Sequence, residues 1–150
     1  MDTTEGMPDE MCGLYFEDLE VGMTGSFKKQ ITHTDIIGYA DITGDTNPLH
    51  LDEEFACQTM FKGRIVHGML TASFISTVIG TKMPGPGCIY VSQNLRFKAP
   101  VRIGDIVNAR CKITKLIREK NFAEMSTICT IGTKKVVDGN ATILVPSRVQ

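Results

Sequence analysis

The chain lacks several patterns that would assign a protein class at once. No apolar run approaches the length that crosses a bilayer, so the sequence predicts no membrane-spanning segment. The formal net charge is only −1, and such a balance does not favour nucleic acid as a partner. A Gly-x-Ser-x-Gly nucleophile elbow and a phosphate-binding loop ending in Lys-Ser/Thr are both missing. The chemistry must therefore come from other residues.

Cysteine is present in an odd number and without a Cys-x-x-Cys pair. This pattern argues against a disulfide framework and against a zinc knuckle, and we expect a reducing cytoplasm. Cys111 and Cys129 fall within alternating strand patterns, which predicts that they are small core residues. The five are Cys12, Cys57, Cys88, Cys111 and Cys129.

The length of 150 residues and the hydrophobic content of 42% predict a single domain with one substantial core. Residues 1–13 are polar, with a proline and two glycines, and we interpret them as a loose tail. Because four acidic residues lie in this tail and no apolar segment does, it does not resemble a secretory signal. The domain is expected to span residues 14–150.

The clearest helix is predicted for residues 67–82. Its apolar side chains cover nearly the whole circumference, and a helix that is apolar all round is a buried helix. A shorter helix is predicted for residues 34–43, with Thr34 as its N-cap, and another for residues 52–58, capped by Asp52. The apolar set of the long helix is Met69, Leu70, Ala72, Phe74, Ile75, Val78 and Ile79.

Beyond Gly87 the hydrophobic period changes from that of a helix to two. Strands are predicted at 89–97, 105–117, 122–131 and 135–145, after a weaker one at 24–32, and Gly139 suggests a bulge in the last. Long strands at hairpin spacing imply an antiparallel sheet. The economical solution is an α+β fold in which the sheet curls around the one long central helix, the hot-dog arrangement. An uncovered sheet edge then predicts a symmetric homodimer.

An acid and an imidazole flank a turn that proline fixes. The segment at 45–50 reads Asp-Thr-Asn-Pro-Leu-His, and the proline restricts both itself and Asn47 before it. This turn can bring the Asp45 carboxylate and the His50 imidazole together around one water, which one group deprotonates while the other returns a proton to a substrate. The alternative is structural: Asp45 caps the turn and His50 is a histidine with its hydrogen bonds satisfied.

A His-Gly pair opens the predicted long helix. Backbone N–H groups at a helix start are unsatisfied and carry a positive partial charge. Because Gly68 has no side chain, a carbonyl oxygen could approach its N–H closely, which suits the stabilisation of an enolate. The alternative is that Gly68 only lets the sheet pack close to the helix.

Taken together, these segments resemble the MaoC-like (R)-specific enoyl-CoA hydratases. The segment at 45–50 matches the family's Asp-x-Asn-Pro-x-His motif. Residues 65–70 are similar to the start of its central helix, and residues 95–101 and 104–105 to the strand and turn that follow. The resemblance extends from about Phe16 to Pro146.

The resemblance implies a hydro-lyase that adds water reversibly to a trans-2-enoyl-CoA and gives the (R)-3-hydroxyacyl-CoA. Asp45 and His50 would activate the water, the N–H of Gly68 would bind the thioester oxygen, and Ser76 and Asn47 would lie near the substrate. No metal and no separate cofactor is expected, since coenzyme A is part of the substrate; acyl carrier protein is an alternative carrier. A hot-dog thioesterase and a non-catalytic acyl-thioester-binding subunit remain alternatives.

Overall fold

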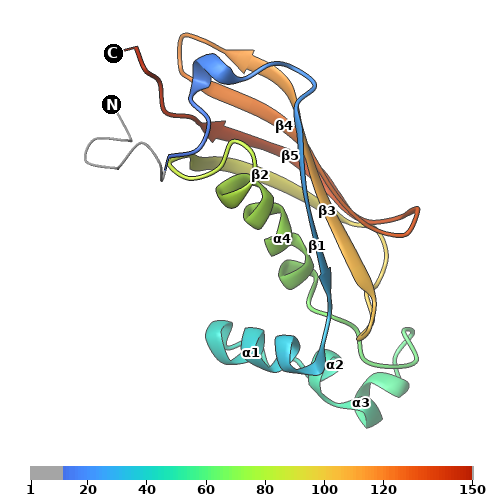
Figure 1. Cartoon of the computed structure of the whole chain (residues 1–150). Coiled ribbons are helices and arrows are strands. Elements are labelled where there is room, and N and C mark those ends of the chain that lie inside the picture. The colour runs from blue at the N-terminus through green and yellow to red at the C-terminus, as the bar shows by residue number, and fades with distance from the viewer. Residues whose placement is uncertain (1–11, 150) are drawn as a thin grey trace.

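The computed structural model describes residues 12–149, which form a five-stranded antiparallel sheet with one long helix against it (Figure 1). The sheet order is β1-β3-β4-β5-β2. The strands are β1 Thr24–Gln30, β2 Ile89–Phe97, β3 Ile106–Ile117, β4 Phe122–Ile131 and β5 Lys134–Leu144. The helices are α1 His33–Thr43, α2 Pro48–Leu51, α3 Glu53–Cys57 and α4 Gly68–Thr81. The predicted α+β hot-dog fold is confirmed, and no helix among residues 12–149 has the length and apolarity to cross a membrane.

The core lies between α4 and the inner face of the sheet. On α4, Ile75, Val78 and Ile79 are at most 1% exposed. The facing strands bury every second side chain, as their alternation predicts, and Cys111 and Cys129 belong to this core as expected. Burial raises the pKa of each of these two thiols to about 12, so both stay protonated and unreactive.

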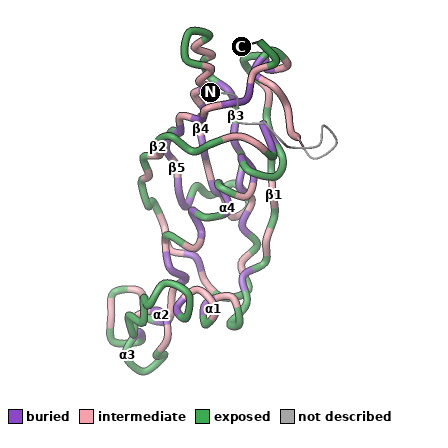
Figure 2. Tube along the Cα trace, turned by 90° about the vertical axis from the view of Figure 1, so that its left-hand side faces the viewer, coloured by how far each residue is buried: buried purple, intermediate pink, exposed green. Residues whose placement is uncertain are grey.

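Helix α4 is not buried all round, contrary to the sequence-based expectation. Met69 is 53% exposed, and Ser73 and Ser76 on the same side are also exposed. The sheet covers one side of α4, and Figure 2 shows the purple buried trace concentrated where α4 meets the strands. Apolar residues around most of the helix therefore did not mean that other parts of this chain cover every side of α4.

Two local features differ from their predictions. Helix α1 is capped by Thr32 rather than Thr34, because Thr32 and Asp35 form a reciprocal capping box: the Asp35 N–H donates to Thr32 Oγ1 at 3.2 Å and the Thr32 N–H to Asp35 Oδ2 at 2.8 Å. Gly139 makes no bulge and stays in register with Leu95 and Thr127 on the neighbouring strands. A side chain at Gly139 would collide with the backbone of Asn94, so close strand approach explains the glycine.

The start of the described chain is tied to the rest of the fold. The N–H of Gly13 donates to the Pro86 carbonyl and that of Leu14 to the Pro84 carbonyl, both at 2.8 Å. The remainder of the predicted tail, up to residue 11, lies outside the described residues, as does Gln150.

The buried face of α4 should carry much of the fold's stability. We expect Ile75→Ala to lower the free energy of unfolding by about 2–5 kcal/mol, because the truncated side chain leaves a cavity that the sheet cannot fill. Ile42→Ala on α1, where the side chain is 89% exposed, is the matched control and should change it by less than about 0.5 kcal/mol. Urea unfolding at fixed protein concentration measures both; equal effects would contradict this location of the core.

Candidate active site

The turn between α1 and α2 is built by capping residues. Helix α1 ends at Gly44, whose φ of 78° is left-handed and whose N–H donates to Ala40 O at 2.8 Å. Asn47 then caps α2, its Oδ1 accepting from the Leu49 N–H at 3.0 Å, and Pro48 takes the first helical position. Asn47 is therefore occupied in holding the turn, while its predicted contact with a substrate stays a prediction.

This turn leaves Asp45 exposed and His50 buried. Asp45 Oδ1 accepts from the Asn47 N–H at 3.3 Å, so part of its carboxylate does stabilise the turn. His50 is 8% exposed, and its Nδ1 lies 2.8 Å from the carbonyl oxygen of Ile65. Because a carbonyl can only accept, Nδ1 carries the proton, which leaves Nε2 of the neutral ring as a base.

The surroundings of His50 favour its neutral form. Burial is the largest effect, and it lowers the pKa of His50 below its ordinary value of 6.5. The hydrogen bond to Ile65 and the charge of Asp45 raise this pKa, and the nearby His67 lowers it. The pKa is lowered on balance. A neutral imidazole can accept a proton at neutral pH, as a general base must.

A second histidine completes the cluster. His67 is 1% exposed and its Nε2 donates to the backbone carbonyl of Asp45 at 3.0 Å. Polar atoms of Asp45, His50 and His67 lie within 4.8 Å of one another, and we call these three residues the Asp–His–His cluster. Two imidazoles and a carboxylate could hold a divalent transition-metal ion as well as a water, so the expected absence of a metal remains a prediction.

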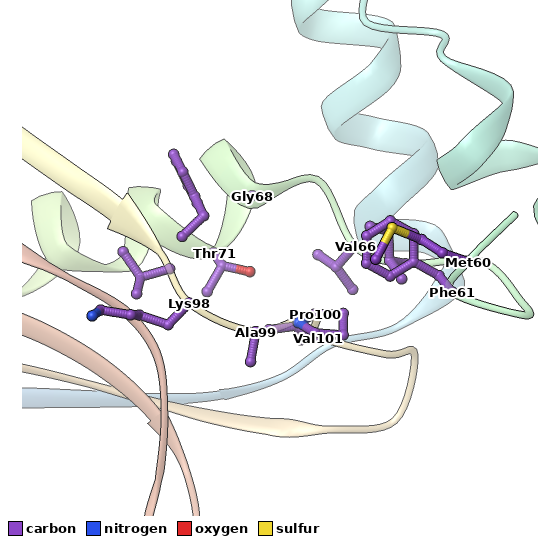
Figure 3. A pocket seen from close by; sticks show the side chains of 12 residues that line it. Met60, Phe61, Val66, Gly68, Thr71, Lys98, Ala99, Pro100 and Val101 are labelled. Carbon is purple, nitrogen blue, oxygen red and sulfur yellow. The ribbon is translucent and has the colours of Figure 1, made fainter.

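A largely apolar pocket of about 410 Å³ (Figure 3) is lined in part by the chain segment that also contacts the cluster. Ile65 belongs both to its wall and to the hydrogen bond with His50, and Gly68 on the wall follows His67 directly. The chain segment at residues 65–68 therefore belongs both to the pocket wall and to the surroundings of the cluster. The lining residues are Met60, Phe61, Ile65, Val66, Gly68, Thr71, Phe97, Lys98, Ala99, Pro100, Val101 and Val137.

Gly68 is packed against the end of β2. A Cβ added there would lie 2.8 Å from two ring atoms of Phe97, which is closer than atoms can approach. Gly68 therefore does allow close packing between the sheet and the helix, as the structural alternative states. This packing is compatible with a role of the Gly68 N–H toward a substrate, and that role remains a prediction.

Ser76 lies away from this pocket. It is on the exposed side of α4, two turns beyond Gly68, and does not belong to the lining. Its neighbour Ser73 donates instead to the carbonyl of Met69 one turn back, at 2.7 Å. The structure thus brings Asp45 and His50 together next to Gly68, but it does not bring Ser76 to them within one chain.

Two features of the site were missed in the sequence. Thr71 is 1% exposed, its hydroxyl has no hydrogen-bond partner among the described residues, and Figure 3 shows the oxygen pointing into the pocket. Arg64 links the loop before α4 to α2, since its Nε donates to the His50 carbonyl at 2.7 Å. Neither residue has a sequence signal, because a threonine in a helix and an arginine in a loop are common.

Comparison with known proteins gives a consistent result. The family model described as "MaoC like domain" matches residues 19–138. The chain is 51% identical over 142 residues to the 3-hydroxybutyryl-CoA dehydratase of Methylorubrum extorquens, covering 95% of this chain and 90% of that protein. It is 51% identical over 140 residues to the (R)-specific enoyl-CoA hydratase of Rhodospirillum rubrum, covering 93% and 97%.

A solved structure agrees with these relatives. The unliganded R-hydratase PhaJ1 of Pseudomonas aeruginosa superposes with a TM-score of 0.85 at 39% identity, covering 91% of this chain and 88% of that one. The segment that the family model matches includes all three residues of the Asp–His–His cluster, in the turn at residues 45–50 and just before α4. The chain therefore belongs to the MaoC-like dehydratase family.

Proposed function

We propose that the protein is an (R)-specific enoyl-CoA hydratase, which adds water reversibly to a trans-2-enoyl-CoA. The observation that carries the proposal is the approach of the Asp45 carboxylate and the neutral His50 imidazole beside the helix start at Gly68. The activity named for relatives at 51% identity supports it, and their names favour coenzyme A over acyl carrier protein as the carrier.

The geometry suggests a division of roles. Asp45 and Nε2 of His50 hold one water, whose oxygen adds to C3 of the substrate. The double-bond electrons move onto the thioester oxygen, which the N–H of Gly68 stabilises as an enolate. The pair then returns the proton to C2 from the side on which the water was bound, so the addition is syn and the chemistry uses no redox step.

Removing either member of the pair should abolish most turnover. We expect Asp45→Asn and His50→Gln each to lower kcat for crotonyl-CoA by at least about 10²-fold, a typical size for the loss of positioned acid–base catalysis. The double variant should lose little more than either single one, because both residues hold the same water. Loss of enoyl-thioester absorbance measures the rate.

Asp41→Asn is a matched control, since Asp41 is exposed on α1 outside the cluster and its variant should keep wild-type turnover. Thermal melts establish that the variants fold. Near wild-type turnover in either cluster variant would remove that residue from the mechanism. Release of free coenzyme A would instead indicate a thioesterase, and binding without turnover would indicate an acyl-thioester-binding subunit.

The pH dependence should reflect the neutral His50. Because burial lowers the pKa of His50 below its ordinary value of 6.5, the neutral base should persist to a lower pH than in a free histidine. We therefore expect the acid limb of kcat/KM, on which His50 takes up a proton, to be centred below pH 6.5. A profile of kcat/KM from about pH 4.5 to 9 measures this. An acid limb centred at or above pH 6.5 would contradict the account.

We propose that the active unit is a homodimer joined through β2. This strand is at the sheet edge, and Ile89, Val91 and Phe97 on it are 46%, 48% and 53% exposed. An apolar edge strand is a template for another strand, and pairing β2 with its copy would satisfy the edge. The five cysteines, all of them free, are consistent with a cytoplasmic location, which remains a proposal.

A charge on this edge should separate the two copies. Sedimentation equilibrium of the wild type should give a dimer at micromolar concentration, whereas Val91→Lys should shift it towards monomer with reduced turnover. Ile42→Lys, at an 89% exposed position on α1, is the control and should remain dimeric. A stable and fully active wild-type monomer would refute this interface.

A further inference from the structure

His67 is the one member of the Asp–His–His cluster to which the proposed reaction gives no step. Its ring is close to two others: the centroid is 4.0 Å from that of His50 and 4.7 Å from that of Tyr39 on α1. It is the residue before α4, yet its side chain makes no capping hydrogen bond to that helix. A histidine buried to this degree needs another reason for its place.

The hydrogen bond of His67 defines its protonation. Because the Asp45 carbonyl accepts from Nε2, the proton lies on Nε2. The other nitrogen, Nδ1, is buried and has no partner among the described residues. A proton on Nδ1 would be a buried donor without an acceptor, so the hydrogen bonds favour the proton on Nε2.

This bond acts on the backbone of the predicted catalytic acid. Asp45 lies in an exposed turn that is also held by its own N–H, which donates to Thr43 Oγ1 at 3.2 Å, by its carboxylate and by the Asn47 cap. The His67 bond ties that turn to the buried chain just before Gly68, and the ring contact holds the plane of His50 from one side. His67 thereby connects the three groups that the reaction needs: the acid, the imidazole and the helix start.

We propose that His67 is a positioning residue, which fixes Asp45 through Nε2–H and orients His50 through its ring. The proposal deepens the proposed hydratase function and rests on it for its kinetic consequence. A misplacement of about 1 Å in a catalytic group can cost about 10²-fold in rate, so a residue that touches no substrate can still govern turnover.

Two variants separate the donor from the ring. His67→Phe keeps an aromatic ring and removes the donor, whereas His67→Gln keeps an N–H donor near the position of Nε2 and removes the ring. We expect kcat for crotonyl-CoA to fall about 10²-fold in His67→Phe with KM changed less than about 3-fold, and His67→Gln to recover at least about 10-fold of that loss. Tyr39→Phe, which keeps the ring against His67, should stay near the wild type.

Kinetic results of two kinds would overturn the proposal. One is wild-type kcat in a folded His67→Phe variant. The other is a His67→Gln variant that is folded by thermal melt and no more active than His67→Phe, because a merely space-filling role would not be rescued by the donor.

A measurement without substrate tests the same hydrogen bond independently. The chain has three histidines, so nitrogen-15 spectra of the histidine-labelled wild type can be assigned with His33→Gln and the cluster variants. We expect His67 to carry a proton on Nε2 and not on Nδ1, and His50 to carry its proton on Nδ1. A proton on Nδ1 of His67 would overturn the inference even if the enzyme is active. If the expected tautomers are found but crotonyl-CoA is not hydrated, the proposed function fails and the hydrogen bond stands.

Discussion

The chain segment at residues 65–68 is the constraint on which the site depends. The Ile65 carbonyl accepts from His50 at 2.8 Å, the Val66 N–H donates to the Val101 carbonyl at 2.8 Å, and His67 donates to the Asp45 carbonyl at 3.0 Å. One short stretch thus fixes an exposed acid, a buried imidazole and the start of α4 relative to one another. The two histidine bonds are partly buried and the Val66–Val101 bond joins two buried residues, so breaking one would leave a polar group shielded from water without its partner.

The fold supplies the rigidity that this segment needs. Helix α4 is held against the sheet by buried aliphatic side chains, and the chain that follows β2 supplies the opposite wall of the pocket. Strand β2 itself lies at one edge of the sheet, and its last residue, Phe97, packs on Gly68. A partner at this edge would therefore lie beside the site, so assembly and catalysis would be coupled through β2.

Most of the framework could be predicted from the sequence because it depends on local periodicity. Alternation located β3 and β4 to within a residue, and the Asn-Pro pair indicated the turn that leads into α2, the helix that carries His50. The cap of α1 was misplaced because Thr32 and Thr34 are both acceptable caps, and only the reciprocal bond to Asp35 distinguishes them. The prediction of a bulge at Gly139 was wrong, because a glycine in a strand can instead allow a neighbouring backbone, here that of Asn94, to come close. The roles of His67 and Thr71 depend on contacts with residues far away in the chain, and local periodicity cannot predict such contacts.

In the proposed reaction, one acid–imidazole pair delivers both parts of water to the same face of an enoyl thioester. Hydration of crotonyl-CoA in deuterium oxide tests it most directly, with the product's configuration at C2 and C3 determined by proton NMR and chiral chromatography. The account predicts (R)-3-hydroxybutyryl-CoA with deuterium at C2 on the face that received the oxygen. An (S) product, or deuterium on the opposite face, would contradict it.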